Sequence, residues 1–121
     1  MSYILVVDDD PSVRTFTARA LKIDGHIVDE ADDGDVALEN IVNQAGGYDL
    51  ILSDIRMPVM DGIEMAKNAA KDFPDLKILL MTGYAEQRER AEDLKKVIID
   101  VVPKPFTLTN IREAVSKALA A

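Results

Sequence analysis

Hydrophobic residues along the chain follow two patterns that alternate with each other. Short runs rich in apolar and β-branched residues predict strands, and longer segments with an apolar residue every three or four positions predict amphipathic helices. Across the 121 residues the alternation indicates five strands, each followed by a helix. The predicted strands are 4–7, 26–31, 50–52, 78–81 and 97–102, and the predicted helical segments are 11–25, 35–47, 62–73, 85–96 and 107–121.

This alternation predicts an α/β fold with a doubly wound parallel sheet. Four of the strands are almost entirely apolar, which is typical of strands that helices cover on both faces, whereas 26–31 is polar enough to be an edge strand. Right-handed crossovers between parallel strands favour a flavodoxin-like order of 2-1-3-4-5 with five helices. The whole chain, 1–121, is predicted to be a single domain.

Composition narrows the function classes. The net charge is −8, from 22 acidic and 14 basic residues, which disfavours direct binding to nucleic acid because phosphate contacts need clustered Lys and Arg. The sequence has no cysteine, so disulfides and thiolate metal sites are excluded. It also has neither an apolar run long enough for a membrane span nor a signal-peptide pattern, so we expect no membrane association and a cytoplasmic location.

Polar side chains follow four of the predicted strands. Asp8 and Asp9 come after the first strand, Asp54 after the third, Thr82 after the fourth and Lys104 after the fifth. Ligands of open parallel sheets bind at the carboxyl ends of the strands, near the point where the strand order switches. These five side chains are therefore expected to meet at one edge of the sheet.

Their combination suggests phosphoryl chemistry. Carboxylates such as Asp8, Asp9 and Asp54 suit Mg²⁺, and a metal-bound carboxylate beside Lys104 can attack phosphorus to form an aspartyl phosphate. Mg²⁺ and the lysine would neutralise the phosphoryl oxygens, and the Thr82 hydroxyl would donate to one of them. Singly, each residue is more commonly a cap, a loop residue or a solvated side chain, so the prediction rests on their convergence.

Other acidic residues receive structural interpretations. Asp10 precedes Pro11 and is predicted to cap the first helix instead of binding metal. The stretch DEADDGDVALEN lacks the ligand spacing of an EF-hand, and Asp33 and Asp35 are predicted to begin the second helix. We assign no role to His26, the single histidine.

The motifs VVDDD, LILSDIRMPVMDG, MTG and KPF occur in this order, and with them the chain resembles the receiver domain of two-component response regulators from end to end. The resemblance implies that Asp54 accepts a phosphoryl group from a phosphohistidine on a sensor histidine kinase or a histidine phosphotransfer protein. It also implies a Mg²⁺ site formed by Asp8, Asp9, Asp54 and the backbone carbonyl of Arg56.

The same resemblance assigns two further roles. Thr82 would be the switch hydroxyl and Lys104 the phosphate-binding lysine, with a cis peptide expected between Lys104 and Pro105. One position departs from the family pattern, because Val101 stands where a Tyr or Phe often lies three residues before the lysine. We hypothesise that Tyr84, two residues after Thr82, takes over the aromatic part of the switch.

The implied function is a signalling switch and not a turnover enzyme. Phosphorylation would change a protein-binding face near the last two helices and the fifth strand, and a downstream protein would read it. No output domain follows the closing helix, so we expect a stand-alone regulator, with onward phosphoryl relay or excision from a longer regulator as alternatives. The charged fourth helix, 85–96, has a thin apolar stripe and a possible pair between Glu86 and Arg90, and it is equally consistent with a moving element and with a solvent-facing helix.

Two other function classes fit less well. A phosphatase similar to haloacid dehalogenases would use a first-strand aspartate as nucleophile and would need a late acidic pair, where the sequence offers only Asp100. A flavin-mononucleotide binder would need a phosphate-binding first loop, where three aspartates would repel the phosphate. The sequence identifies neither the kinase, the downstream target, the phosphoryl lifetime nor the oligomeric state.

Overall fold

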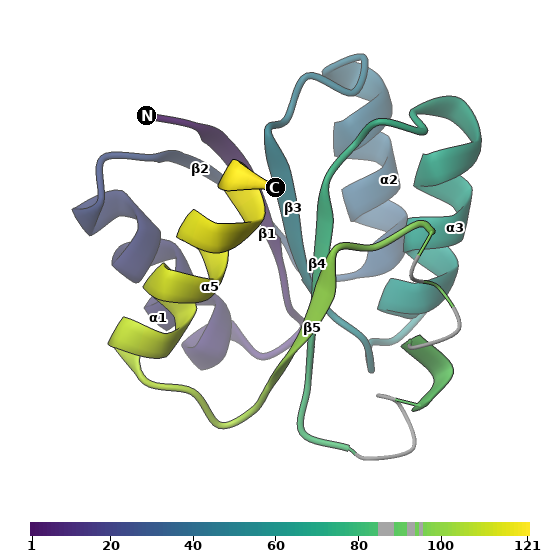
Figure 1. Cartoon of the computed structure of the whole chain (residues 1–121). Coiled ribbons are helices and arrows are strands. Elements are labelled where there is room, and N and C mark those ends of the chain that lie inside the picture. Colours follow the sequence, from purple (N-terminus) through teal and green to yellow (C-terminus); the bar gives the residue numbers. More distant parts are fainter. Residues whose placement is uncertain (85–88, 92–93, 95) are drawn as a thin grey trace.

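A single parallel sheet forms the centre of the computed structural model, which describes residues 1–84, 89–91, 94 and 96–121 (Figure 1). Within those residues five strands pair in the order β2-β1-β3-β4-β5, which confirms the predicted flavodoxin-like topology. The strands are β1 (Tyr3–Val7), β2 (Ile27–Ala31), β3 (Leu50–Asp54), β4 (Ile78–Thr82) and β5 (Asp100–Pro103).

Helices cover both faces of the sheet. One face carries α1 (Pro11–Ile23) and α5 (Leu108–Ala120), and the other carries α2 (Gly34–Asn43) and α3 (Gly62–Asp72) (Figure 1). The predicted fourth helix includes 85–88, 92–93 and 95, which lie outside the described residues. Among the described helices, none combines the length and the apolar character needed to span a bilayer.

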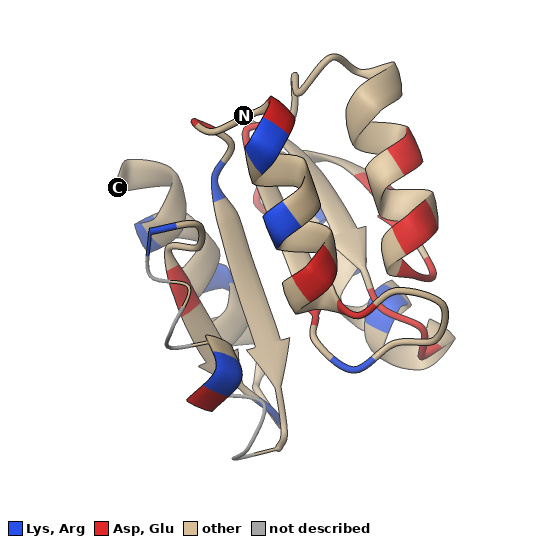
Figure 2. Ribbon diagram, turned by 90° about the vertical axis from the view of Figure 1, so that its right-hand side faces the viewer, with Lys and Arg blue, Asp and Glu red and all other residues tan. Residues whose placement is uncertain are grey.

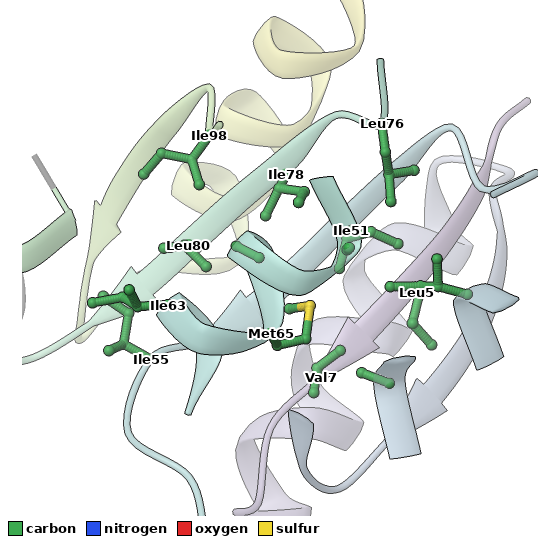
Figure 3. Close-up of a cluster of buried hydrophobic side chains, with 14 of the residues drawn as sticks. Leu5, Val7, Ile51, Ile55, Ile63, Met65, Leu76, Ile78, Leu80 and Ile98 are labelled. Atoms are coloured by element: carbon green, nitrogen blue, oxygen red, sulfur yellow. The ribbon is translucent and has the colours of Figure 1, made fainter. Parts of the chain in front are cut away.

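Alternation along the strands divides the core into two layers. In β1, Leu5 and Val7 pack in the cluster under α2 and α3, whereas Ile4 and Val6 pack in the cluster under α1 and α5. The first cluster is drawn in Figure 3. Because side chains alternate between the two faces of a strand, a run such as ILVV is apolar throughout only when both faces are covered.

Two predictions about apolar positions were wrong. The fifth strand begins at Asp100 and not at 97, because Ile98 turns into the α2/α3 cluster and Ile99 donates its N–H to the Ile78 carbonyl before the ladder starts. Phe16 recurs at helical spacing with Ala20 and Leu21, which predicts a place on the apolar stripe of the first helix, but it is 41% exposed and Thr17 is buried beside it.

Aspartates begin two of the helices, as predicted. Asp10 Oδ1 accepts hydrogen bonds from the N–H groups of Ser12 (2.9 Å) and Val13 (3.3 Å) at the start of α1. Asp33 Oδ1 accepts from the N–H of Val36 (2.8 Å) at the start of α2. Both carboxylates satisfy main-chain donors that the helix itself leaves unpaired.

Candidate functional site

Three carboxylates meet at the carboxyl end of the sheet. Asp8 follows β1 and Asp54 ends the adjacent β3, where Val7 and Ser53 are paired in register. One carboxylate oxygen each from Asp8, Asp9 and Asp54 lies within 4.8 Å of the others. Asp8 is fully buried, Asp54 is 8% exposed and Asp9 is exposed. The cluster is therefore buried on the side of Asp8 and open to solvent on the side of Asp9.

Lys104 reaches this cluster from the end of the edge strand β5. Its Nζ lies 2.9 Å from Asp8 Oδ2 and 3.4 Å from Asp54 Oδ2, although β3 and β4 separate β5 from β1. Burial lowers the pKa of the ammonium, but the hydrogen bond to Asp8 and the charges of Asp54 and Asp8 outweigh burial and raise it above its ordinary value. The lysine therefore stays protonated, and its single positive charge is shared between two buried carboxylates.

Burial dominates the chemistry of Asp54. It raises the pKa of this carboxyl to about 6, against the opposing effect of Lys104, while the charge of Asp8 raises it further. The N–H of Ile55 donates to Asp54 Oδ1 (2.9 Å), and Oδ2 faces the lysine. At neutral pH Asp54 is thus ionised but poorly solvated, as suits a nucleophile.

Every polar group of Asp8 has a partner. Its N–H donates to the Ala31 carbonyl (3.1 Å), and its own carbonyl accepts from Arg14 Nη1 (2.8 Å). Its Oδ1 accepts from the Asp10 N–H (3.0 Å), and its Oδ2 accepts from Lys104. Sequence reasoning missed Arg14, because an arginine that binds a main-chain carbonyl leaves no motif.

Gly62 was also missed, although it fixes the other acidic strand end. Its N–H donates to the Ile55 carbonyl (2.7 Å), and an added Cβ would collide with the carbonyl oxygen of Asp54. The signal was present in the MDG motif, where Asp61 caps α3 by accepting from the Glu64 N–H (2.8 Å) and glycine follows it. A close backbone approach of this kind admits only glycine.

The remaining predicted site residues flank the carboxylates. Thr82 is buried at the end of β4, and its Oγ1 accepts a hydrogen bond from the Tyr84 N–H (3.1 Å). The Arg56 guanidinium lies 4.8 Å from the centre of the Tyr84 ring, close enough for a cation–π contact. Val101 packs half-buried against the α2/α3 cluster, so it takes a structural place at the position that departs from the family pattern.

An apolar wall borders one side of the groove that holds the carboxylates. It is formed by Val13 and Phe16 of α1 and by Pro105 and Phe106 after β5, with the two phenylalanine ring centres 6.5 Å apart. The Lys104–Pro105 peptide is cis, as predicted. The groove therefore offers a charged floor beside an exposed apolar side.

Acidic residues occupy loop segments at the lower end of the sheet in Figure 2, beyond the arrowheads of the strands. Oxygen ligands from clustered carboxylates are those that Mg²⁺ takes, and the clustered oxygens of Asp8, Asp9 and Asp54 fit a small hard cation. The described site thus brings carboxylates that could hold a divalent cation next to the ammonium of Lys104.

Comparisons with known proteins agree on one family. Residues 4–116 match the family model described as the response regulator receiver domain. The response regulator receiver protein CpdR of Brucella abortus is 37% identical over 121 residues, which cover all of this chain and 99% of that protein. The sensor kinase CckA of the same organism is 36% identical over 119 residues, which cover 96% of this chain and 12% of the kinase.

A solved structure matches over nearly the full length. The response regulator protein TrrA from Thermotoga maritima, solved in complex with Mg(2+)-BeF, superimposes with a TM-score of 0.87 at 35% identity. The match covers 98% of this chain and 99% of that one.

Proposed function

The chain belongs to the response regulator receiver domain family of two-component systems, and we propose that Asp54 is its phosphoacceptor. The phosphoryl donor would be a phosphohistidine on a sensor histidine kinase or a histidine phosphotransfer protein. The observation that carries this proposal is the setting of Asp54, a buried carboxylate held against Lys104 with Asp8 and Asp9 beside it at an open rim.

The proposed transfer uses these residues directly. A carboxylate oxygen of Asp54 bonds to phosphorus while the P–N bond of the phosphohistidine breaks, and the imidazole nitrogen recovers the electron pair and takes a proton. Lys104 neutralises the incoming phosphoryl oxygens, which would otherwise face three carboxylates. Asp8, Asp9, Asp54 and the Arg56 carbonyl would hold Mg²⁺, which supplies further charge neutralisation when bound.

Signal transmission would begin at Thr82. Its hydroxyl can donate to a phosphoryl oxygen while its Oγ1 keeps the hydrogen bond from the Tyr84 N–H, so movement of Thr82 would move Tyr84. We propose that Tyr84 reports phosphorylation where Val101 cannot. NMR on beryllofluoride binding tests this, because a shift at Thr82 with an unchanged Tyr84 ring would refute it.

Partner binding is proposed on two surfaces. The apolar wall of Val13, Phe16, Pro105 and Phe106 lies beside Asp54 and would receive the phosphohistidine-bearing protein, because burial of exposed apolar surface favours docking. A downstream protein would read the face near β5 and α5. In this role the protein is a phosphoacceptor acting in the cytoplasm, with no turnover beyond its own phosphorylation and dephosphorylation.

Burial argues against the phosphatase alternative with a first-strand nucleophile. Asp8 is fully buried, and both of its carboxylate oxygens accept hydrogen bonds, one from Asp10 and one from Lys104. Asp54 is the buried carboxylate with a raised pKa and an oxygen facing the lysine. These contacts support our proposal that the nucleophile is Asp54, at the end of the third strand.

Intact-mass measurement tests the assignment. The protein is incubated with acetyl phosphate and Mg²⁺ and compared with Asp54→Asn and with the control Asp32→Asn, which alters an exposed acid elsewhere. We expect a single phosphoryl adduct on the wild type and on Asp32→Asn, and none on Asp54→Asn. An adduct on all three proteins, or on none, would contradict the role of Asp54.

A further inference from the structure

Arg14 occupies a position between the ends of two strands. It lies in α1, and its Nη1 donates to the main-chain carbonyl of Asp8 (2.8 Å). Its Nε donates to Oε1 of Glu30 on β2 (3.2 Å). The Arg14 side chain is 21% exposed, so the guanidinium is largely enclosed by the elements it connects.

The carbonyl that Arg14 binds belongs to the peptide linking Asp8 to Asp9. The Asp8 N–H still follows the sheet, donating to Ala31, but the chain leaves the sheet at the next residue. A buried carbonyl at such a point needs a donor from outside the ladder, because an unpaired one is costly. Arg14 supplies that donor and so fixes the plane of the Asp8–Asp9 peptide.

We propose that Arg14 is a positioning residue for the cation site, a role that rests on the proposed function. The orientation of this one peptide sets where the carboxylates of both Asp8 and Asp9 point, and their oxygens must converge with one of Asp54. Glu30 orients the guanidinium in turn, which leaves its other end directed at the carbonyl. A ligand's supporting hydrogen bonds commonly decide metal affinity in this way.

Electrostatics alone predicts the opposite effect of Arg14. A guanidinium beside a cation site repels the cation, so removing it should strengthen Mg²⁺ binding if charge were its contribution. The ion pair with Glu30 offsets part of that repulsion. The sign of the change in Mg²⁺ affinity therefore separates positioning from charge.

Titration with Mg²⁺ alone, followed by the amide NMR shifts of the strand-end loops, measures the dissociation constant. Arg14→Met should raise it about tenfold, and Arg14→Lys, which keeps the charge and a donor, should recover part of the loss. Glu30→Gln, a second variant that leaves Arg14 in place, should raise it by a smaller factor. The matched control is Arg112→Met, which removes the same residue type from an ion pair with Asp24 just after α1.

Four results would overturn the inference. An equal or tighter Mg²⁺ dissociation constant in Arg14→Met would show that the arginine does not position the ligands. A matching loss in Arg112→Met would show a general effect of destabilisation, and so would failure of Arg14→Lys to recover any affinity. A wild-type protein that binds no Mg²⁺ would instead contradict the metal in the proposed function, and this inference with it.

Discussion

Two acidic stretches of similar composition follow neighbouring strands, but their side chains differ in burial and in their partners. The stretch 8–10 follows β1 and places Asp8 in full burial against Lys104. The stretch 32–35 follows β2, where Asp32 and Asp35 are exposed and Asp33 caps α2. Both stretches begin a helix, through Asp10 and Asp33, but only the first also contributes to a charged site.

Strand order accounts for the difference. β1 lies between β2 and β3, so its end adjoins Asp54 and comes within reach of the lysine that follows β5. β2 is the edge of the sheet, and its end has a neighbouring strand on one side only. Local acidity therefore becomes a candidate site only where the topology brings further charged groups to it.

Lys104→Met should give the largest effect. It leaves Asp8 buried without its cation, and we expect a loss of about 3 kcal/mol in the free energy of unfolding at pH 7.5. Urea denaturation measures it, with Lys67→Met on α3 as a control at an exposed lysine. Equal losses in the two variants would remove the distinction between the buried and the exposed charges.

Asp54→Asn should stabilise the protein in a pH-dependent way. The pKa of Asp54 is about 6 in the folded protein, above its ordinary value of 3.8, because burial disfavours the charged form. The stability linked to its protonation is present at low pH and is lost as the pH rises through about 6. We therefore compare the free energies of unfolding of the variant and the wild type without added metal. The difference in favour of the variant should be about 2 kcal/mol larger at pH 8 than at pH 4.

The check is urea denaturation at both pH values, with Asp32→Asn as the control. That exposed residue should show the same stability difference from the wild type at pH 4 and pH 8. If the effect of Asp54→Asn on stability did not depend on pH, burial of the ionised Asp54 carboxylate would not lower the free energy of unfolding.

Stabilisation by Mg²⁺ should depend on the stretch 8–10 and not on the stretch 32–35, and its size should be intermediate among these predictions. At ten times its dissociation constant, the metal should stabilise the wild type by about 1.4 kcal/mol. Asp9→Asn should remove most of this gain and Asp32→Asn none of it, as seen in thermal unfolding with and without MgCl₂. A gain that survives in Asp9→Asn would place the cation elsewhere.

Asp33→Ala should give the smallest of these effects. Loss of the cap on α2 should cost about 1 kcal/mol of folding stability without altering the stabilisation by Mg²⁺. Asp33→Asn, which keeps an oxygen acceptor, should lose only a few tenths of a kcal/mol. Thermal unfolding measures both variants. Equal destabilisation of the two would contradict the role of Asp33 as a helix cap.

The fold and the meeting of Asp8, Asp9, Asp54 and Lys104 could be predicted from sequence because both follow from strand ends. An apolar run that stops at a charged residue locates that residue at the edge of the sheet where the strands end. The strand order then determines which of these residues lie close together. The functional roles of these residues remain predictions that the experiments above test.

Other features could not be predicted because their causes are not local. Arg14 acts on a main-chain carbonyl, which every residue possesses, so its target has no sequence signal. Phe16 satisfies helical spacing, yet it lies beside Phe106 on the groove wall, a neighbour brought by the far end of the chain. The fifth strand began late because Ile98 is buried through the α2/α3 cluster instead of through strand pairing.

The contact between Lys104 and Asp8 joins residues 96 positions apart. During synthesis, β1 and its aspartate are made long before the lysine, so the two cannot meet until the last strand has docked. Any folding intermediate without β5 carries the aspartates uncompensated, which favours late and cooperative closure of the sheet. If Asp54 is the phosphoacceptor as proposed, the lysine that serves its site joins it only when β5 docks.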